Sequence, residues 1–319
     1  MTPRESIVES LRLGRPEGLV PHCELEFQLS QELLGREALR AHHLESVSEA
    51  ARDRLLHENA EHWLEIADRF QWSVITGLHW LGLEDQLRSF AIIRDLVGEK
   101  YMLSAFVDGT FSIPNGETMV QHVVWLTEQR EEAHAAAQAS TDGAIETAKR
   151  LLGGGAEIVF MCADYCFNDG PFLSPRMFAE YVTPYLAQLV EGIQAAGGYA
   201  IKHTDGDLMP VLDQIVDTGI DGLHSLDPMA GVDIAEVKRL YGDRTCLFGN
   251  VNCALVQAGT PEQIEASARY CLQHGGVEAG GFVYTTSNCI FRGVPLENYE
   301  VMLRVREEFC AEAEGQAPR

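Results

Sequence analysis

The chain has 319 residues, enough for one large barrel or two smaller domains, and its 46% hydrophobic and 23% charged residues are typical of a globular protein. Its 48 acidic against 24 basic residues give a formal charge of −24, which argues against binding to nucleic acid, itself a polyanion. No apolar run reaches the roughly 20 residues that span a bilayer. The opening stretch MTPRESIVESLRLGRPEG contains no apolar segment of a secretory signal. We therefore expect a cytoplasmic protein that does not enter a membrane.

Short apolar strand candidates alternate with amphipathic helical stretches along the chain, which favours a parallel α/β fold. The eight candidates cover residues 19–27, 72–80, 101–111, 157–165, 199–207, 220–228, 244–252 and 280–288. The region 28–71 reads as helices inserted after the first strand. Eight strand–helix units in about 300 residues predict a single (β/α)8 (TIM) barrel domain over 1–319. A doubly wound sheet would alternate similarly, but no GxGxxG motif follows a strand.

Three of the helical stretches carry clear end signals. Thr260 is a candidate N-cap with Pro261 at the first helical position. The stretch DIAEVKRLYG begins after its candidate cap Asp233 and stops at Gly242. Gly197 ends the helical region that begins near residue 175.

Polar side chains follow nearly every strand candidate. In a (β/α)8 barrel these strand ends meet at the mouth where active sites lie. The ring comprises Glu24, Glu26, His79, Asp108, Asp164, His203, Asp205, His224, Asp227, Asn250, Asn252, Asn288 and Cys289. The alternative is that such residues only cap the following helices, since strand–helix loops are polar in any case.

His203 and Asp205 are the most informative pair. They are two residues apart on a strand-like segment, so their side chains point to the same face. An H-x-D pair of this kind can bind a divalent metal, orient a substrate, or act as acid and base.

Several segments together resemble the uroporphyrinogen decarboxylase superfamily. They are DYCFNDGPFLSPRMFAEYVTPY, IKHTDGDLMPVLDQIVDTGIDGLHSLDP, DIAEVKRLYGDRTCLFGNVN, GTPEQI and GGFVYTTSNCIFRGVPLENYEVML, and the resemblance covers roughly residues 155–305. The superfamily fold is a (β/α)8 barrel, and its members include the haem-pathway decarboxylase and cobamide-dependent methyltransferases. The arginine-rich N-terminal motif with which the decarboxylase binds its polycarboxylate substrate has no counterpart here, and Glu24 and Glu26 would repel such a substrate. The resemblance therefore points to the methyltransferase branch.

Methyltransferases of this kind hold zinc with a His-x-Cys pair at the fifth strand and a further Cys at the eighth. The histidine matches His203, the first cysteine matches Asp205, and the second matches Asn288, with Cys289 one place further on. The implied metal set is thus His203, Asp205, Asn288 and Cys289. It is a harder N/O site than a thiolate site, which could hold zinc more weakly or another divalent ion. The alternative is that it holds no metal and that His203 and Asp205 act directly on the substrate.

The remaining candidates are assigned roles around this pair. Asp164 and Glu24 are candidate catalytic acids or further ligands beside His203 and Asp205. Candidate substrate contacts are Glu26, His79, Tyr165, His224 and Asn250.

The reaction implied is methyl transfer between a small O-, N- or S-methyl compound and a cobamide on a separate corrinoid protein, because no corrinoid-binding Asp-x-His-x-x-Gly signature occurs here. The resemblance also suggests a homodimer. Two rivals stay open. One is a decarboxylase or lyase acting on a small carboxylate, and the other is a non-catalytic barrel that serves as an assembly subunit.

Overall fold

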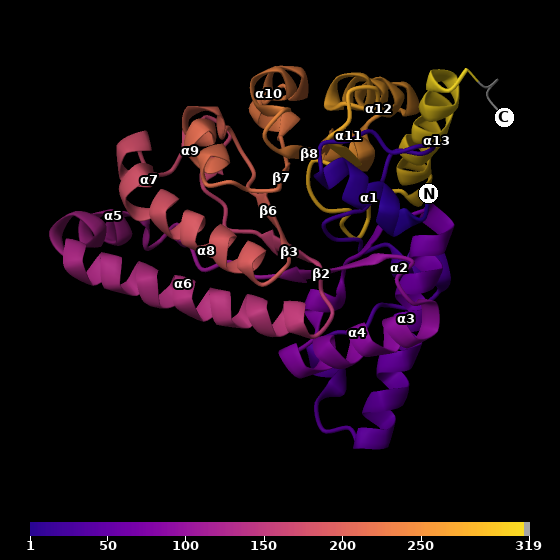
Figure 1. Cartoon of the computed structure of the whole chain (residues 1–319), viewed down its shortest axis with the longest axis horizontal. Coiled ribbons are helices and arrows are strands. Elements are labelled where there is room, and N and C mark those ends of the chain that lie inside the picture. The colour runs from indigo at the N-terminus through magenta and orange to yellow at the C-terminus, as the bar shows by residue number, and fades with distance from the viewer. Residues whose placement is uncertain (316–319) are drawn as a thin grey trace.

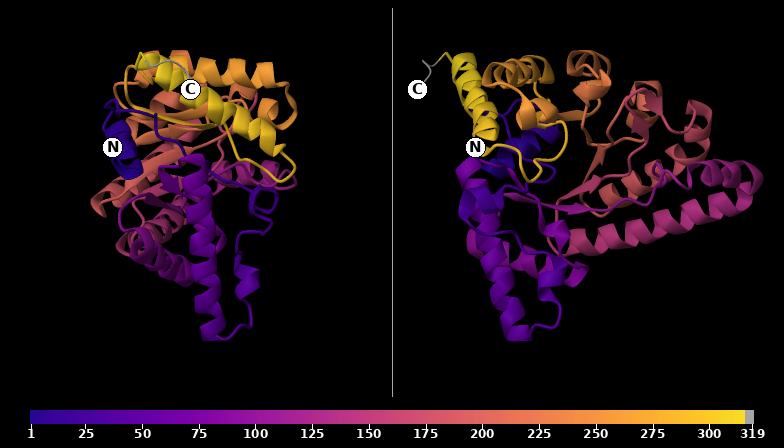
Figure 2. Two further views of the ribbon diagram at one scale, coloured as in Figure 1. Left: turned by 90° about the vertical axis from the view of Figure 1, so that its right-hand side faces the viewer. Right: turned by 180° about the vertical axis from the view of Figure 1, so that it is seen from behind.

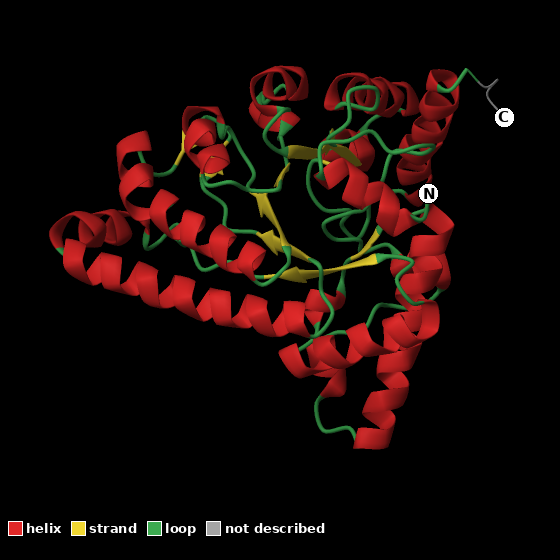
Figure 3. Cartoon of the chain, in the orientation of Figure 1, coloured by secondary structure: helices red, strands yellow, loops and turns green. Residues whose placement is uncertain are grey.

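The computed structural model describes residues 1–315, and its centre is a sheet of seven parallel strands in the order β1-β2-β3-β6-β7-β8-β9. The sheet curls on itself and the helices lie around it (Figures 1 and 3). A separate antiparallel pair, β4 (Cys166–Phe167) and β5 (Gly170–Pro171), follows β3. The strands of the main sheet are β1 (Val74–Ile75), β2 (Met102–Phe106), β3 (Ile158–Met161), β6 (Tyr199–His203), β7 (Gly222–His224), β8 (Cys246–Val251) and β9 (Phe282–Thr286).

The prediction of a strand over 19–27 is wrong, because the segment forms no regular strand. Each of the other seven candidates contains an observed strand. The 19–27 segment forms only isolated parallel bridges, from His22 to Tyr284 and from Phe27 to Ile290. Pro21 has no N–H to donate to a ladder, which is one reason that the pairing stays local. The carbonyl of His22 nevertheless accepts the N–H of Ser73 (2.6 Å), so the segment lies between β9 and β1 and closes the barrel. The (β/α)8 architecture is therefore confirmed.

The interior of the barrel is filled by side chains at alternate strand positions, as the pleat requires. Phe160, Ile201 and Phe248 belong to this buried cluster. Ile7 and Leu11 of the N-terminal helix join the same cluster and plug one end. Since Ile201 faces inward, His203 two residues later faces inward as well, at the carboxyl end of β6.

The helices cover the outside of the sheet, and η1 (Ala41–Leu44) and α3 project from the barrel in Figure 2. The predicted inserted helices thus lie after the first segment. The α-helices are α1 (Pro3–Leu11), α2 (Ser30–Leu34), α3 (Glu49–Phe70), α4 (Leu83–Val97), α5 (Met119–Glu128), α6 (Arg130–Gly153), α7 (Pro175–Tyr181), α8 (Thr183–Ala195), α9 (Leu212–Asp217), α10 (Ile234–Tyr241), α11 (Cys253–Ala258), α12 (Pro261–Gly275) and α13 (Leu296–Ala313).

The predicted helix ends are largely as observed. Thr260 caps α12 by accepting the N–H of Gln263, and Asp233 caps α10 by accepting that of Ala235. Within the described residues, no helix combines the length and apolar character needed to cross a membrane.

Candidate metal-binding and catalytic site

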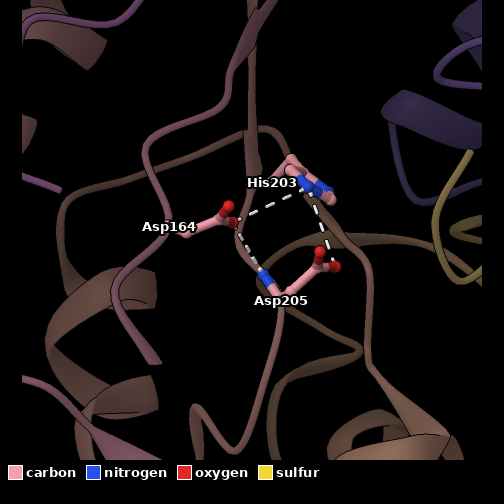
Figure 4. Close-up of side chains that lie close together, drawn as sticks. All are labelled: Asp164, His203 and Asp205. Carbon is pink, nitrogen blue, oxygen red and sulfur yellow. Dashed lines mark hydrogen bonds and ion pairs between the residues drawn. The ribbon is translucent and has the colours of Figure 1, made fainter. Parts of the chain in front are cut away.

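Three side chains converge at the carboxyl ends of β3 and β6. His203 is the last residue of β6, Asp205 lies in the loop that follows, and Asp164 lies in the loop after β3. The Nε2 atom of His203 lies 3.9 Å from Asp164 Oδ1 and 3.7 Å from Asp205 Oδ1. The backbone N–H of Asp205 donates to Asp164 Oδ1 (3.1 Å), which ties the two loops together. Figure 4 shows the three side chains facing one another.

This group stands out by its composition. Among residues 1–315 it is the one set of three His, Cys, Asp or Glu side chains whose ligand atoms all lie within 4.8 Å of one another. His203 is almost fully buried, whereas the side chains of Asp164 and Asp205 are 48% and 31% exposed. One side of the group is therefore open to solvent and to small molecules.

The electrostatics favour a cation between these atoms. Burial, followed by the charge of Lys202, lowers the pKa of His203 to about 3, so its imidazole is neutral near pH 7. Burial, together with the neighbouring charge of Asp164, raises the pKa of Asp205 to about 6. Both causes of the Asp205 shift reflect the cost of placing negative charge here without a partner. A divalent cation would remove that cost.

Two further strands fix the orientation of Asp205. The hydroxyl of Ser225, directly after β7, donates to Asp205 Oδ1 (2.8 Å). The side-chain amide of Asn288, after β9, donates to Asp205 Oδ2. The oxygen of that amide accepts the backbone N–H of Cys289 (2.7 Å), so Asn288 turns its N–H₂ group, which cannot be a metal ligand, toward Asp205.

The sulfur of Cys289 is not among the clustered ligand atoms of this group. Its side chain is buried, and burial, followed by the charge of Glu26, raises the pKa of its thiol above the ordinary value, which favours the protonated form. Of the predicted metal set, the structure thus brings His203, Asp205 and Asn288 together. Asp164 supplies the third possible metal ligand beside His203 and Asp205. The sequence analysis named it as a candidate catalytic acid or further ligand.

Glu24 is fully buried behind the Asn288 turn. Its Oε2 atom contacts the hydroxyls of Thr286 (2.5 Å) and Thr285 (3.1 Å), and its Oε1 atom has no hydrogen-bond partner among the described residues. Burial raises the pKa of Glu24 to about 8, against the hydrogen bonds from Thr286. Glu24 therefore carries a proton near pH 7 and does not belong to the cluster of ligand atoms.

Glu26 and His79 form a second pair on the same side of the barrel. The Nε2 atom of His79 lies 3.2 Å from Glu26 Oε1, and its ring stacks on Phe106 with centroids 3.9 Å apart. Burial raises the pKa of Glu26, but the hydrogen bond and charge of His79 outweigh it, so the net pKa is lowered. Both remain candidates for substrate contact.

The other three predicted substrate contacts are buried. Tyr165 is 3% exposed and its hydroxyl pairs with Thr110 (2.6 Å). The side-chain amide of Asn250 donates to the Leu226 carbonyl (2.7 Å). His224 is 1% exposed and lies behind His203. These positions hold the loops that carry the site rather than line its open side.

Sequence reasoning missed the partner of Asp108 and the role of Ser225. Lys202 is fully buried, and its ammonium donates to Asp108 Oδ2 (2.9 Å) and to the Ala163 carbonyl (2.8 Å) next to Asp164. A lysine inside the apolar run YAIKH was the available signal, since a buried charge requires a partner.

Comparisons with known proteins show the family to which the chain belongs. The family model described as uroporphyrinogen decarboxylase (URO-D) matches residues 78–309. The chain belongs to this family.

The relatives that it resembles include coenzyme M methyltransferases and a uroporphyrinogen decarboxylase. It is 25% identical over 228 residues to the methylcobamide:CoM methyltransferase MtaA of Methanosarcina barkeri, a match that covers 70% of this chain and 63% of the relative. It is 29% identical over 185 residues to the methylated-thiol–coenzyme M methyltransferase of Methanosarcina mazei, covering 58% of this chain and 47% of that one. It is 30% identical over 146 residues to the uroporphyrinogen decarboxylase of Chlorobium luteolum, covering 43% of this chain and 39% of that one. The aligned part is thus less than two thirds of each relative.

The fold comparison covers nearly the whole chain. A solved methyltransferase from Methanosarcina mazei superimposes with a TM-score of 0.75 at 18% identity, covering 97% of this chain and 99% of that one. A vitamin B12-independent methionine synthase from Shewanella sp. W3-18-1 gives a TM-score of 0.53 at 12% identity, with 84% and 90% covered. At these identities the likeness concerns the fold, which is the barrel of the family.

Proposed function

We propose that this protein is a methyltransferase that moves a methyl group between a small O-, N- or S-methyl compound and the cobamide of a separate corrinoid protein. The observation that carries the proposal is the convergence of Asp164, His203 and Asp205 at the open end of a URO-D family barrel. The similarity to two methyltransferases that act with coenzyme M supports the reaction class.

The donor set fits a divalent metal such as zinc. Three atoms, one nitrogen and two carboxylate oxygens, lie within 4.8 Å of one another, and the exposed carboxylates leave one side free for a further ligand. An ion held there would supply a Lewis acid that withdraws electron density from the heteroatom bonded to the methyl group. With two carboxylate oxygens where the sequence resemblance implies two thiolates, the site is harder than a zinc-thiolate site.

The residues of the chain then have distinct tasks. His203 offers a neutral nitrogen from the rigid end of β6, and Asp205 is held in one orientation by Ser225 and Asn288. Asp164 adds a second negative charge that offsets the charge of a divalent ion. The acidic mouth disfavours a polycarboxylate substrate, which weighs against porphyrinogen decarboxylation.

A methyl-transfer assay tests the proposal. Untagged protein loaded with zinc is mixed with methylcobalamin and a panel of small thiols, and with reduced cobalamin and a panel of methyl ethers, methylamines and methyl thioethers, while the corrinoid absorbance is followed. We expect metal-dependent transfer in the wild type and its loss in His203→Ala and Asp205→Asn.

The matched control is Asp207→Asn, since Asp207 lies on the same loop, accepts the backbone N–H of Met209 (3.1 Å), and is not one of the three clustered side chains. Transfer at the wild-type rate in His203→Ala, or none in the wild type with any pair, would contradict the proposal.

A further inference from the structure

Two neighbouring strands place a second histidine directly behind His203. In the parallel pairing of β6 with β7, His203 is the partner of His224. Both side chains are buried, and their Nδ1 atoms are 2.7 Å apart. This distance is a hydrogen bond, so the two imidazoles share one proton between their Nδ1 atoms.

The hydrogen bond couples the tautomers of the two rings. A neutral imidazole carries its proton on one nitrogen only. If His203 donates from Nδ1, its Nε2 presents a lone pair to Asp164 and Asp205, and His224 must carry its own proton on Nε2. If His224 donates instead, His203 carries its proton on Nε2, and that atom cannot bind a metal.

Metal binding selects the first arrangement. Nε2 of His203 lies 3.9 and 3.7 Å from the nearest oxygens of Asp164 and Asp205, beyond hydrogen-bond range but within the spacing of ligand atoms that could hold one metal ion. An ion on Nε2 requires the proton of this ring to lie on Nδ1, and the atom placed to accept it is Nδ1 of His224. The Nε2–H of His224 then has no hydrogen-bond partner among the described residues, a cost that the bound ion must offset.

We propose that His224 is a positioning residue that accepts the Nδ1 proton of His203 and thereby keeps the Nε2 lone pair of His203 directed between Asp164 and Asp205. The purpose of this arrangement, presenting a metal ligand, rests on the proposed function. The hydrogen bond itself is a property of the metal-free protein. Histidine ligands are commonly fixed by an acceptor at their second nitrogen, and here that acceptor is another imidazole instead of a carboxylate or carbonyl.

The first test reads the tautomers of the zinc-loaded protein. Long-range ¹H–¹⁵N correlation spectra of histidine-labelled protein loaded with zinc at pH 7 distinguish protonated from bare or metal-bound ring nitrogens, and His203→Ala and His224→Leu assign the two signals. We expect His203 to be protonated at Nδ1 and His224 at Nε2. The opposite pair of tautomers would overturn the inference.

The second test measures affinity for zinc by competition with a chromogenic chelator. Removing such a second ligand-fixing partner lowers metal affinity about 10- to 100-fold, and we expect this for His224→Leu. His224→Asn can place an amide oxygen where Nδ1 was and should recover most of the affinity. The control is His62→Leu, another buried histidine whose Nε2 has no partner among the described residues, and it should bind like the wild type.

The outcomes separate the two proposals. Unchanged zinc affinity in a folded His224→Leu variant would overturn the positioning role. A wild-type protein that binds no zinc, cobalt(II) or manganese(II) would instead overturn the metal-assisted mechanism and the positioning role with it, and would leave only the hydrogen bond between the two rings.

Discussion

Asp205 has two sets of neighbours in the barrel mouth. Ser225 and Asn288 donate hydrogen bonds to it, while burial, followed by the charge of Asp164, raises its pKa to about 6. Hydrogen bonds alone leave the two carboxylates side by side without a cation. A bound divalent ion would satisfy both, so the folded state should gain stability from metal.

That gain can be measured by unfolding. At free zinc 100 times the Kd, binding to the folded state adds about 2.7 kcal/mol to the free energy of unfolding. We expect zinc to raise the Tm of the wild type and of Asp207→Asn, and to leave that of Asp205→Asn nearly unchanged. A similar shift in all three proteins would indicate that zinc binds elsewhere.

Glu24 predicts a pH dependence of stability. Its pKa is raised from 4.5 to about 8 in the folded state, so between these values the folded protein holds a proton that the unfolded chain has released. The carboxyl's contribution is complete below pH 4.5 and is lost as the pH rises through 8, with a slope of at most about 1.4 kcal/mol per pH unit. We expect urea unfolding of Glu24→Gln to show a flatter profile over this window. An unchanged profile would contradict the buried, protonated carboxyl.

Sequence reasoning identified most of the residues in the site but not their arrangement. His203, Asp205 and Asp164 follow from the rule that strand ends meet at the barrel mouth. The choice between Asn288 and Cys289 depends on a turn whose register is set by the Asn288–Cys289 hydrogen bond and by the pairing of Phe27 with Ile290. Contacts between such distant segments are not visible in local sequence patterns.

At the scale of elements, the register between β6 and β7 explains how the two buried histidines of the site come to lie together. It places His203 beside His224, and the alternation along β6 sends Lys202 to the opposite face. There Lys202 joins β6 to the ends of β2 and β3 through Asp108 and the carbonyl of Ala163. The same strand thus supplies a metal-ligand candidate on one face and a buried ion pair on the other.

The ion pair predicts a large effect on stability. Lys202 is fully buried and Asp108 nearly so, so Asp108→Asn leaves a buried ammonium without its counter-ion. Breaking such a pair typically lowers the free energy of unfolding by about 3–5 kcal/mol, whereas replacing both charges is far milder. Urea unfolding should therefore show Asp108→Asn to be less stable than the double variant Asp108→Asn/Lys202→Met. Equal losses in both would show that the charge is not the cause.

Strand prediction succeeded for the seven strands of the main sheet. It failed for the segment 19–27, which closes the barrel through contacts with residues that are distant in the sequence. The seven strands of the main sheet coincide with predicted runs, since parallel strands are buried on both faces. The segment 19–27 has a similar apolar character, but Pro21 and the single bridges at His22 and Phe27 keep it irregular. Its role as the closing element comes from its place between β9 and β1.

For the molecule as a whole, the N-terminal helix completes the barrel. Ile7 is fully buried in the interior cluster, while its neighbour Val8 is only partly buried. We expect Ile7→Ala to lower the free energy of unfolding by about 2–5 kcal/mol, because it leaves a cavity in the packed interior. Val8→Ala, measured in the same urea series, should have a clearly smaller effect. The reverse order would contradict the packing of α1 into the barrel.

The central claim is that the mouth of the barrel holds a divalent ion with nitrogen and oxygen ligands from Asp164, His203 and Asp205. X-ray absorption of the zinc-loaded protein tests it most directly, because oxygen or nitrogen at about 2.0–2.1 Å is distinct from sulfur at about 2.3 Å. We predict one equivalent of zinc with an N/O shell that is lost in His203→Ala. A sulfur contribution would instead assign a cysteine such as Cys289 as ligand, and a protein that takes up no zinc would contradict the metal site altogether.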